Sequence, residues 1–268
     1  MDSPATPPSQ VTAASALGSL TAARDLVASL DPLGIPLLVL KGPPLQRRLL
    51  GSDCAYQSAD IDLLVPAGEA RRVRRRMREQ GWEFLPENGV LWWVDRAAAF
   101  TRGGVTVDLH WGVHAYTLGA LRFRSLERAL WRDATRSPEG WLEPLPEPLV
   151  VYLAVNWAGH HYDDGHRLTL VRAAAALVTD WPRAREIART ARVTAILEAA
   201  LHRSAGNPEV ETPPLAGAQV SGITSRALAR ARVQRPEALR RALLNVRYRP
   251  VTARPRKNGE RRLRKRRS

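Results

Sequence analysis

The chain has 268 residues, 44% of them hydrophobic, and a formal net charge of +15. This length allows one large domain or two small ones, and the apolar content supports a real core. The longest apolar runs fall far short of the ~18 residues of a membrane span, and the first residues lack the pattern of a signal peptide. The single cysteine, Cys54, excludes an internal disulfide. From these observations together we expect a soluble cytoplasmic protein.

The positive charge is concentrated at the C-terminal end. Residues 1–225 hold 24 Lys/Arg and 24 Asp/Glu, whereas residues 226–268 hold 17 Lys/Arg and 2 Asp/Glu. Such an arginine-rich run repels itself, so we expect residues 251–268 to be a disordered basic tail. The tail could contact nucleic acid without sequence preference, or it could be a solvated extension.

The first part of the chain is predicted to mix helices and strands. Residues 1–11 are rich in Pro, Ser and Thr and are expected to be disordered. A helix follows over 12–30, then a short strand over 35–40, a helix opened by Pro43 or Pro44 and running to Leu50, and a second strand over 60–65. Residues 69–80 read as a strongly basic helix with a solvated outer face.

The sequence then predicts short strands and, after them, helices. Strands are expected over 82–85, 90–94, 98–101 and 105–111, with a turn at Gly103 and Gly104. Beyond residue 115 helices are expected over 118–130, 147–160, 166–178, 182–192 and 194–205, with a weaker helical region over 216–249. We therefore expect an α+β protein: a small mixed sheet flanked by helices (12–115), a helical region (116–250) and the basic tail.

Three acids stand out because of their positions in predicted strands. Asp60 and Asp62 are two residues apart at the start of a strand, so their carboxylates share one face and need a compensating cation. Mg²⁺ is the usual cation for oxygen ligands, with Mn²⁺ as an alternative. Asp108, on a neighbouring strand, would complete a second metal site or accept the proton of an attacking hydroxyl.

A Lys-Gly pair lies upstream, at a predicted strand-to-helix turn. Gly42 allows backbone amides to approach a phosphate, and the following helix N-terminus favours negative charge. Lys41 is the only lysine before residue 257 in an arginine-rich chain, and its ammonium could neutralise a triphosphate. The sequence therefore predicts a site for a metal-bound nucleotide.

These motifs resemble the nucleotidyltransferase superfamily that includes DNA polymerase beta and the aminoglycoside nucleotidyltransferases. The resemblance rests on residues 40–45, 60–65 and 107–111, and more weakly on 156–161; it covers about residues 15–180. More narrowly, the chain is similar to a largely uncharacterised branch in which Lys-Gly replaces the usual Gly-Ser. In this chain Pro43 follows Gly42, so the serine of the common turn is absent.

The resemblance implies a role for each matching residue. Asp60 and Asp62 would bind Mg²⁺, and Asp108 would be the third acid, a metal ligand or base. Gly42 would meet the nucleotide phosphates, with Lys41 as the branch-specific lysine. The remaining expected site residues are Ser58 for the nucleotide and His110, His160 and His161 for the acceptor substrate; zinc binding by the histidines is not expected.

The leading hypothesis is a Mg²⁺-dependent enzyme that moves a nucleoside monophosphate from an NTP, with ATP favoured, to a hydroxyl or phosphate of an acceptor. A small molecule or peptide is the favoured acceptor. Two alternatives stay open. Asp60 and Asp62 could form the D-x-D motif of a glycosyltransferase, or the chain could be a non-catalytic relative that binds RNA or a protein partner through its tail.

Overall fold

The computed structural model describes residues 10–52, 60–85, 97–115, 121–160 and 165–206. The described helices are α1 Gln10–Leu30, the 3₁₀ turn η1 Asp31–Leu33, α2 Pro43–Leu50, α3 Ala70–Glu79, α5 Arg124–Trp131, α6 Pro146–Gly159, α7 Gly165–Leu177, α8 Trp181–Thr190 and α9 Thr194–Ser204. The described strands are β1 Leu38–Val39, β2 Asp60–Leu64, β3 Glu83–Leu85, β4 Ala97–Arg102, β5 Val105–His110, β6 His114–Ala115, β7 Leu121–Arg122, β8 Thr135–Arg136 and β9 Leu142–Glu143.

A seven-stranded mixed sheet forms the centre of this part of the chain, with strand order β3-β4-β5-β2-β1-β9-β8. Strands β3, β4 and β5 form an antiparallel meander, with a tight turn at Gly103 and Gly104 between β4 and β5. Strand β5 then runs parallel to β2, which is antiparallel to β1. The α+β class predicted from the sequence is confirmed.

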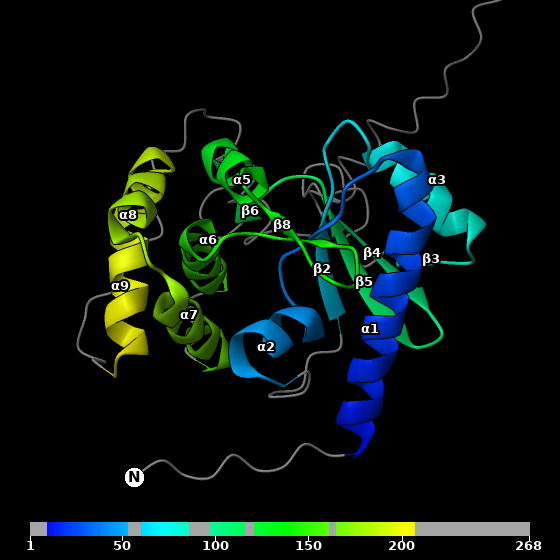
Figure 1. Ribbon diagram of the computed structural model, residues 1–268, viewed down its shortest axis with the longest axis horizontal. Coiled ribbons are helices and arrows are strands. Elements are labelled where there is room, and N and C mark those ends of the chain that lie inside the picture. Colours follow the sequence, from blue (N-terminus) through cyan, green and yellow to red (C-terminus); the bar gives the residue numbers. More distant parts are fainter. Residues whose placement is uncertain (1–9, 53–59, 86–96, 116–120, 161–164, 207–268) are drawn as a thin grey trace, which may run out of the picture. The chain divides into compact units, whose positions relative to one another are not determined.

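The two faces of the sheet carry separate hydrophobic cores, because successive side chains of a strand point to opposite faces. Ile61 and Leu63 of β2 belong to a core that includes residues of α1 and α3. Leu64 of β2 belongs to a second core, built mainly from α5 to α9. Figure 1 shows α1 and α3 on one side of the strands and α6 to α9 on the other. Asp60 and Asp62 share the face of Leu64, so they point toward the side of α6.

Helix α6 is the centre of the second core. Of its 14 residues, 11 are buried, and it packs against α5, α7, α8 and α9. A helix that is apolar on all sides is stable only when other elements surround it, as here. The helices predicted over 147–160, 166–178, 182–192 and 194–205 are confirmed within two residues at each end.

Several sequence expectations differ from the structure. The helix expected over 118–130 begins only at Arg124, because Leu121 and Arg122 pair with β6 as strand β7. Helix α1 begins at Gln10, inside the segment expected to be disordered. Strands β8 and β9 were not foreseen, and β9 extends the main sheet from beyond residue 115. The strand expected over 90–94, the helix over 216–249 and the basic tail lie outside the described residues.

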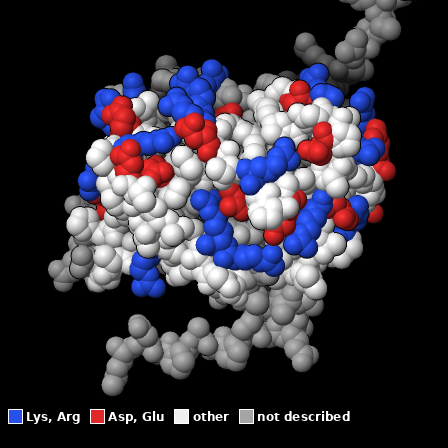
Figure 2. Space-filling model, in the orientation of Figure 1, with Lys and Arg blue, Asp and Glu red and all other residues white. Residues whose placement is uncertain are grey.

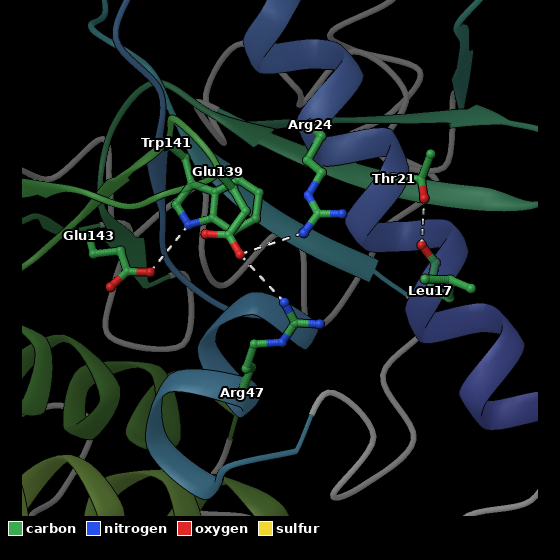
Figure 3. Close-up of polar contacts among 7 residues, drawn as sticks. All are labelled: Leu17, Thr21, Arg24, Arg47, Glu139, Trp141 and Glu143. Carbon is green, nitrogen blue, oxygen red and sulfur yellow. Dashed lines mark hydrogen bonds and ion pairs between the residues drawn. The ribbon is translucent and has the colours of Figure 1, made fainter.

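The turn between β8 and β9 ties α2 to the rest of the fold. Glu139 of this turn forms ion pairs with Arg24 of α1 at 3.6 Å and with Arg47 of α2 at 3.5 Å. Beside it, Trp141 Nε1 donates to Glu143 at 3.3 Å (Figure 3). The pair between Glu139 and Arg47 helps to fix α2, whose N-terminus faces β2.

Several basic side chains of the described surface form ion pairs with acidic neighbours. On α3, Arg72 pairs with Glu69, and Arg75 and Arg76 pair with Glu79. Figure 2 likewise shows acidic side chains beside basic ones over the face it draws. The solvated outer face expected for this helix is confirmed, and the structure adds these ion pairs to it.

A buried acid, Glu147, connects the start of α6 to the turn between α7 and α8. Its side chain is 4% exposed, and Oε1 accepts the backbone N–H of Thr179 and of Asp180 at 3.3 Å each. The Thr179 hydroxyl donates to the same oxygen at 3.4 Å. Removing this acceptor would break the three hydrogen bonds that hold the start of α6 to this turn, each of which contributes about 0.5–1.5 kcal/mol.

We expect Glu147→Ala to lower the free energy of unfolding by about 2–3 kcal/mol, since it also leaves a small cavity. Glu147→Gln keeps an acceptor oxygen and should lose much less. Urea unfolding followed by tryptophan fluorescence measures both, with Glu186→Ala on the exposed face of α8 as a surface control. Equal unfolding midpoints for Glu147→Ala and the surface control would contradict this account.

Candidate active site

The candidate site is built on two adjacent parallel strands. Asp62 of β2 lies in register with Asp108 of β5, so the two side chains stand next to each other on one face of the sheet. Neighbouring strands are about 4.8 Å apart, which brings the carboxylates into direct electrostatic contact. Asp62 is 5% exposed and Asp108 is partly exposed. The predicted adjacency of the second and third acids is therefore confirmed.

The turn after β1 packs directly on β2. Leu40 N donates to the Asp62 carbonyl at 2.9 Å, and Gly42 follows with φ +94° and ψ −170°. A Cβ at Gly42 would lie 2.8 Å from the carbonyl oxygen of Asp60 and 3.0 Å from the Cα of Ile61. Only glycine has both the conformational freedom and the small size for this position.

Helix α2 begins immediately after this glycine with Pro43 and Pro44. Proline suits the first helical turn because its missing N–H would have no helical partner there. The same feature removes two donors from the helix N-terminus. A phosphate at this turn would therefore depend on the remaining amides and on the charge of Lys41.

Two side chains bind the same oxygen of Asp62. Lys41 Nζ lies 3.1 Å and His110 Nε2 lies 3.0 Å from Oδ1. The Lys41 and His110 side chains are 21% and 24% exposed, whereas that of Asp62 is 7% exposed. His110, two residues beyond Asp108 on β5, thus orients the second acid rather than the third.

The two aspartates have opposite pKa shifts. Burial raises the pKa of Asp62, but the positive charge of Lys41 and the hydrogen bond from His110 outweigh it, and the pKa falls well below its usual value. For Asp108, burial and the negative charge of Asp62 raise the pKa to about 6, although His110 and Lys41 oppose the shift. At neutral pH one acid is a fixed anion, while the other can exchange a proton.

Three side chains of the described residues converge as a possible metal site. One ligand atom each from Asp62, Asp108 and His110 lies within 4.8 Å of the others. The two carboxylates of this set suit Mg²⁺ or Mn²⁺. The residues present therefore fit a divalent ion.

Asp60 lies two positions earlier than Asp62 on β2, opposite Thr106 of β5. It is close enough that its charge contributes to the raised pKa of Asp108, but it is not one of the three converging ligands. The predicted metal set of Asp60, Asp62 and Asp108 thus stays a prediction, and the structure adds His110 as a candidate ligand.

The other predicted contacts are placed less centrally or lie outside the described residues. His160 caps the C-terminal end of α6 and is exposed. Ser58 and His161 lie outside the described residues, so their expected contacts with nucleotide and acceptor stay predictions.

Tyr152 of α6 was not foreseen as a site residue. It is 6% exposed, and burial together with the charges of Asp62 and Asp108 raises the pKa of its hydroxyl well above the usual value. Its phenol therefore lies near both acids and stays neutral. The sequence offered no signal, because Tyr152 lies within an apolar helix where an aromatic residue is ordinary core.

Paired carboxylates, a glycine turn and an ammonium are the groups with which proteins hold a divalent ion and the phosphates of a nucleotide. Comparison of the sequence with known protein families supports an enzyme that acts on nucleotides. Residues 7–210 match the family described as uncharacterised nucleotidyltransferase, and the chain belongs to that family. The family supports a transferase enzyme, and its description as a nucleotidyltransferase family favours the nucleotidyl-transfer hypothesis over the glycosyltransferase and non-catalytic alternatives.

Comparisons with individual proteins add little. No curated protein matches the chain. Among solved structures, the solution structure of the antibiotic-resistance factor ANT(2'')-Ia is similar, with a TM-score of 0.48 and 15% identity. The match covers 71% of this chain and 98% of that one. Separately, none of the described helices combines the length and apolar character needed to cross a bilayer.

Proposed function

We propose that this protein is a divalent-metal-dependent enzyme that transfers a nucleoside monophosphate from an NTP, with ATP as the nucleotide, to an acceptor. The acceptor is a hydroxyl or phosphate group of a small molecule or peptide. The observation that carries the proposal is the in-register pairing of Asp62 with Asp108, beside a turn that brings Gly42 against β2.

Each residue would have a defined task in this reaction. Asp62 and Asp108, with Asp60 or His110, would hold the metal ion, with Mg²⁺ expected and Mn²⁺ able to replace it. Such an ion withdraws charge from the phosphoryl oxygens. Gly42 would allow the triphosphate to approach the backbone, and the Lys41 ammonium would offset its negative charge.

Asp108 has the properties of a general base. Its carboxylate adjoins that of Asp62, and in the metal-free site its pKa of about 6 is closer to neutral pH than that of an ordinary aspartate. An acceptor oxygen would form a bond to the α-phosphorus while the bond from that phosphorus to the bridging oxygen breaks. The hydroxyl proton would pass to Asp108, and pyrophosphate would leave.

The test is incubation of the full chain with α-labelled and γ-labelled NTPs and a panel of hydroxyl- and phosphate-bearing acceptors. We expect metal-dependent transfer of the α-label and release of the γ-label as pyrophosphate. Transfer of the γ-label to the acceptor would instead identify a kinase. Absence of both reactions, together with no NTP-induced rise in melting temperature, would contradict the proposal.

Metal binding should depend on pH through Asp108. Its pKa of about 6 is above the ordinary value of 3.8, so below that pH a proton must leave before a metal ion binds. Asp62 stays ionised, because its pKa is lowered. We therefore expect Mg²⁺ affinity to be constant above about pH 7 and to fall by up to about tenfold per pH unit below about pH 6.

Titration calorimetry with MgCl₂ in buffers of different ionisation enthalpy would measure both the affinity and the protons released. Asp108→Asn is the matched variant. It should bind Mg²⁺ more weakly than the unmodified chain, and its affinity should not change with pH over this range. An affinity of the unmodified chain that stays constant down to about pH 5 would contradict the role assigned to Asp108.

A further inference from the structure

Lys41 occupies an unexpected position for a lysine that serves a nucleotide. Its ammonium does not extend along the helix N-terminus of α2 but binds Oδ1 of Asp62 at 3.1 Å. His110 Nε2 binds the same oxygen at 3.0 Å. The most buried carboxylate of the candidate metal site is therefore already held by two nitrogen groups.

A divalent ion on Asp62 and the Lys41 ammonium would repel each other. Mg²⁺ binds carboxylate oxygens at about 2.0–2.1 Å, so an ion on Asp62 would lie within about 5 Å of an ammonium kept in place. Two positive groups this close in a buried site repel strongly, because little water screens them. Simultaneous binding of both cations to Asp62 is thus unfavourable.

The identity of the side chain suits a group that must leave. Lys41 is the only lysine before residue 257, whereas the rest of the basic residues up to that point are arginine. A guanidinium would hold a carboxylate in two places, but an ammonium is a single charge on a flexible stem. The side chain is 21% exposed, so its head group has access to the surface.

The place to which the ammonium would move is defined by the chain itself. Lys41 directly precedes Gly42, the residue at which the backbone comes closest to β2. The next two residues, Pro43 and Pro44, bring no N–H groups to bind an anion. A positive charge released from Asp62 would thus remain at a turn that lacks its usual donors.

We propose that Lys41 and the metal ion bind Asp62 in turn, so that metal binding releases the Lys41 ammonium to the nucleotide phosphates. This inference rests on the proposed function and adds a coupling to it: metal and nucleotide each favour the binding of the other through one side chain. Reciprocity of this kind is required of any coupled pair of binding sites.

The test measures Mg²⁺ affinity in the absence of nucleotide, by titration calorimetry. Lys41→Met removes the competing charge and should tighten Mg²⁺ binding by about tenfold, while Lys41→Arg should weaken it below that of the unmodified chain. The same Lys41→Met change should weaken binding of the nucleotide. Lys257→Met is the matched control and should leave the metal affinity unchanged.

A second measurement follows Lys41 directly and needs no substitution at the site. A variant with Lys257→Arg and Lys265→Arg contains one lysine, so NMR of lysine enriched in the NMR-active carbon isotope reports on Lys41 alone. Its signal should shift on addition of MgCl₂ and shift again on addition of nucleotide.

Two results would overturn the inference while leaving the proposed function intact. These are a Lys41→Met variant that binds Mg²⁺ no more tightly than the unmodified chain, and a Lys41 signal that does not change with metal. Failure of the unmodified chain to bind any divalent ion would contradict the proposed function as well, so the two failures can be told apart.

Discussion

Replacing Asp62 by asparagine should lower kcat/KM for nucleotidyl transfer by at least about a thousandfold, equivalent to about 4 kcal/mol in the activation barrier. Asp62 is the carboxylate that Lys41, His110 and the neighbouring Asp108 all face. The asparagine keeps the size of the side chain and an acceptor oxygen but loses the charge that a metal ion needs.

The effect of Asp62→Asn is checked by steady-state assays with the α-labelled NTP and by thermal unfolding, which shows whether the variant still folds. Asp31→Asn is the matched control, since Asp31 is an exposed aspartate that pairs with Arg136 at the surface. A folded Asp62→Asn variant with activity within about tenfold of the unmodified chain would exclude this carboxylate from the chemistry.

Replacing Gly42 by alanine should lower the free energy of unfolding by about 3 kcal/mol or more and abolish nucleotide binding. The residue has φ +94°, and an added Cβ would lie 2.8 Å from the backbone oxygen of Asp60. The added Cβ is bonded directly to the backbone and the oxygen of Asp60 is part of it, so neither atom can rotate away. The contact can therefore be relieved only by moving the turn away from β2.

Gly34→Ala separates the two causes of this loss of stability, which are the positive φ and the close contact of the added Cβ. Gly34 also has a positive φ, +66°, but a Cβ there would meet nothing within 4 Å. It should therefore lose only the conformational term, about 1–2 kcal/mol. Urea unfolding of both variants measures the difference, and an equal loss would show that the close approach to β2 has no energetic consequence.

The elements that carry the site could be predicted because their sequence patterns are strong. The alternation over residues 105–111 and the apolar run after Asp60 both predicted strands, and Pro43 marked the start of α2. The parallel pairing that brings Asp62 opposite Asp108 places the acids as the sequence suggested. What each acid does in the reaction stays a prediction.

Short strands were missed because two-residue segments have no periodicity to recognise. Strand β9 is only Leu142–Glu143, and its place beside β1 is determined by long-range pairing with Leu38. Strand β1 itself is Leu38–Val39, shorter than the apolar run from residue 35 suggested. Burial, rather than strand pairing, accounts for the remaining apolar residues there, since Ile35 and Leu37 belong to the core shared with α1.

Contacts between side chains far apart in the sequence could not be predicted from sequence patterns. Lys41 was expected to meet phosphates, yet it binds Asp62, 21 positions later in the chain. His110 was expected to contact the acceptor, and no sequence pattern indicated that its ring also contacts Asp62. Tyr152 approaches the acids only because α6 packs over that face of the sheet. Each of these contacts depends on how elements pack, which local patterns do not encode.

A crystal structure of the chain with Mn²⁺ and a non-hydrolysable NTP analogue would test the central claim most directly, because the anomalous signal of manganese locates the ion without reference to the protein. The account predicts an anomalous peak between the carboxylates of Asp62 and Asp108, with the triphosphate at the Gly42 turn and the Lys41 ammonium turned toward it. A nucleotide bound elsewhere with no metal at these two aspartates would contradict it.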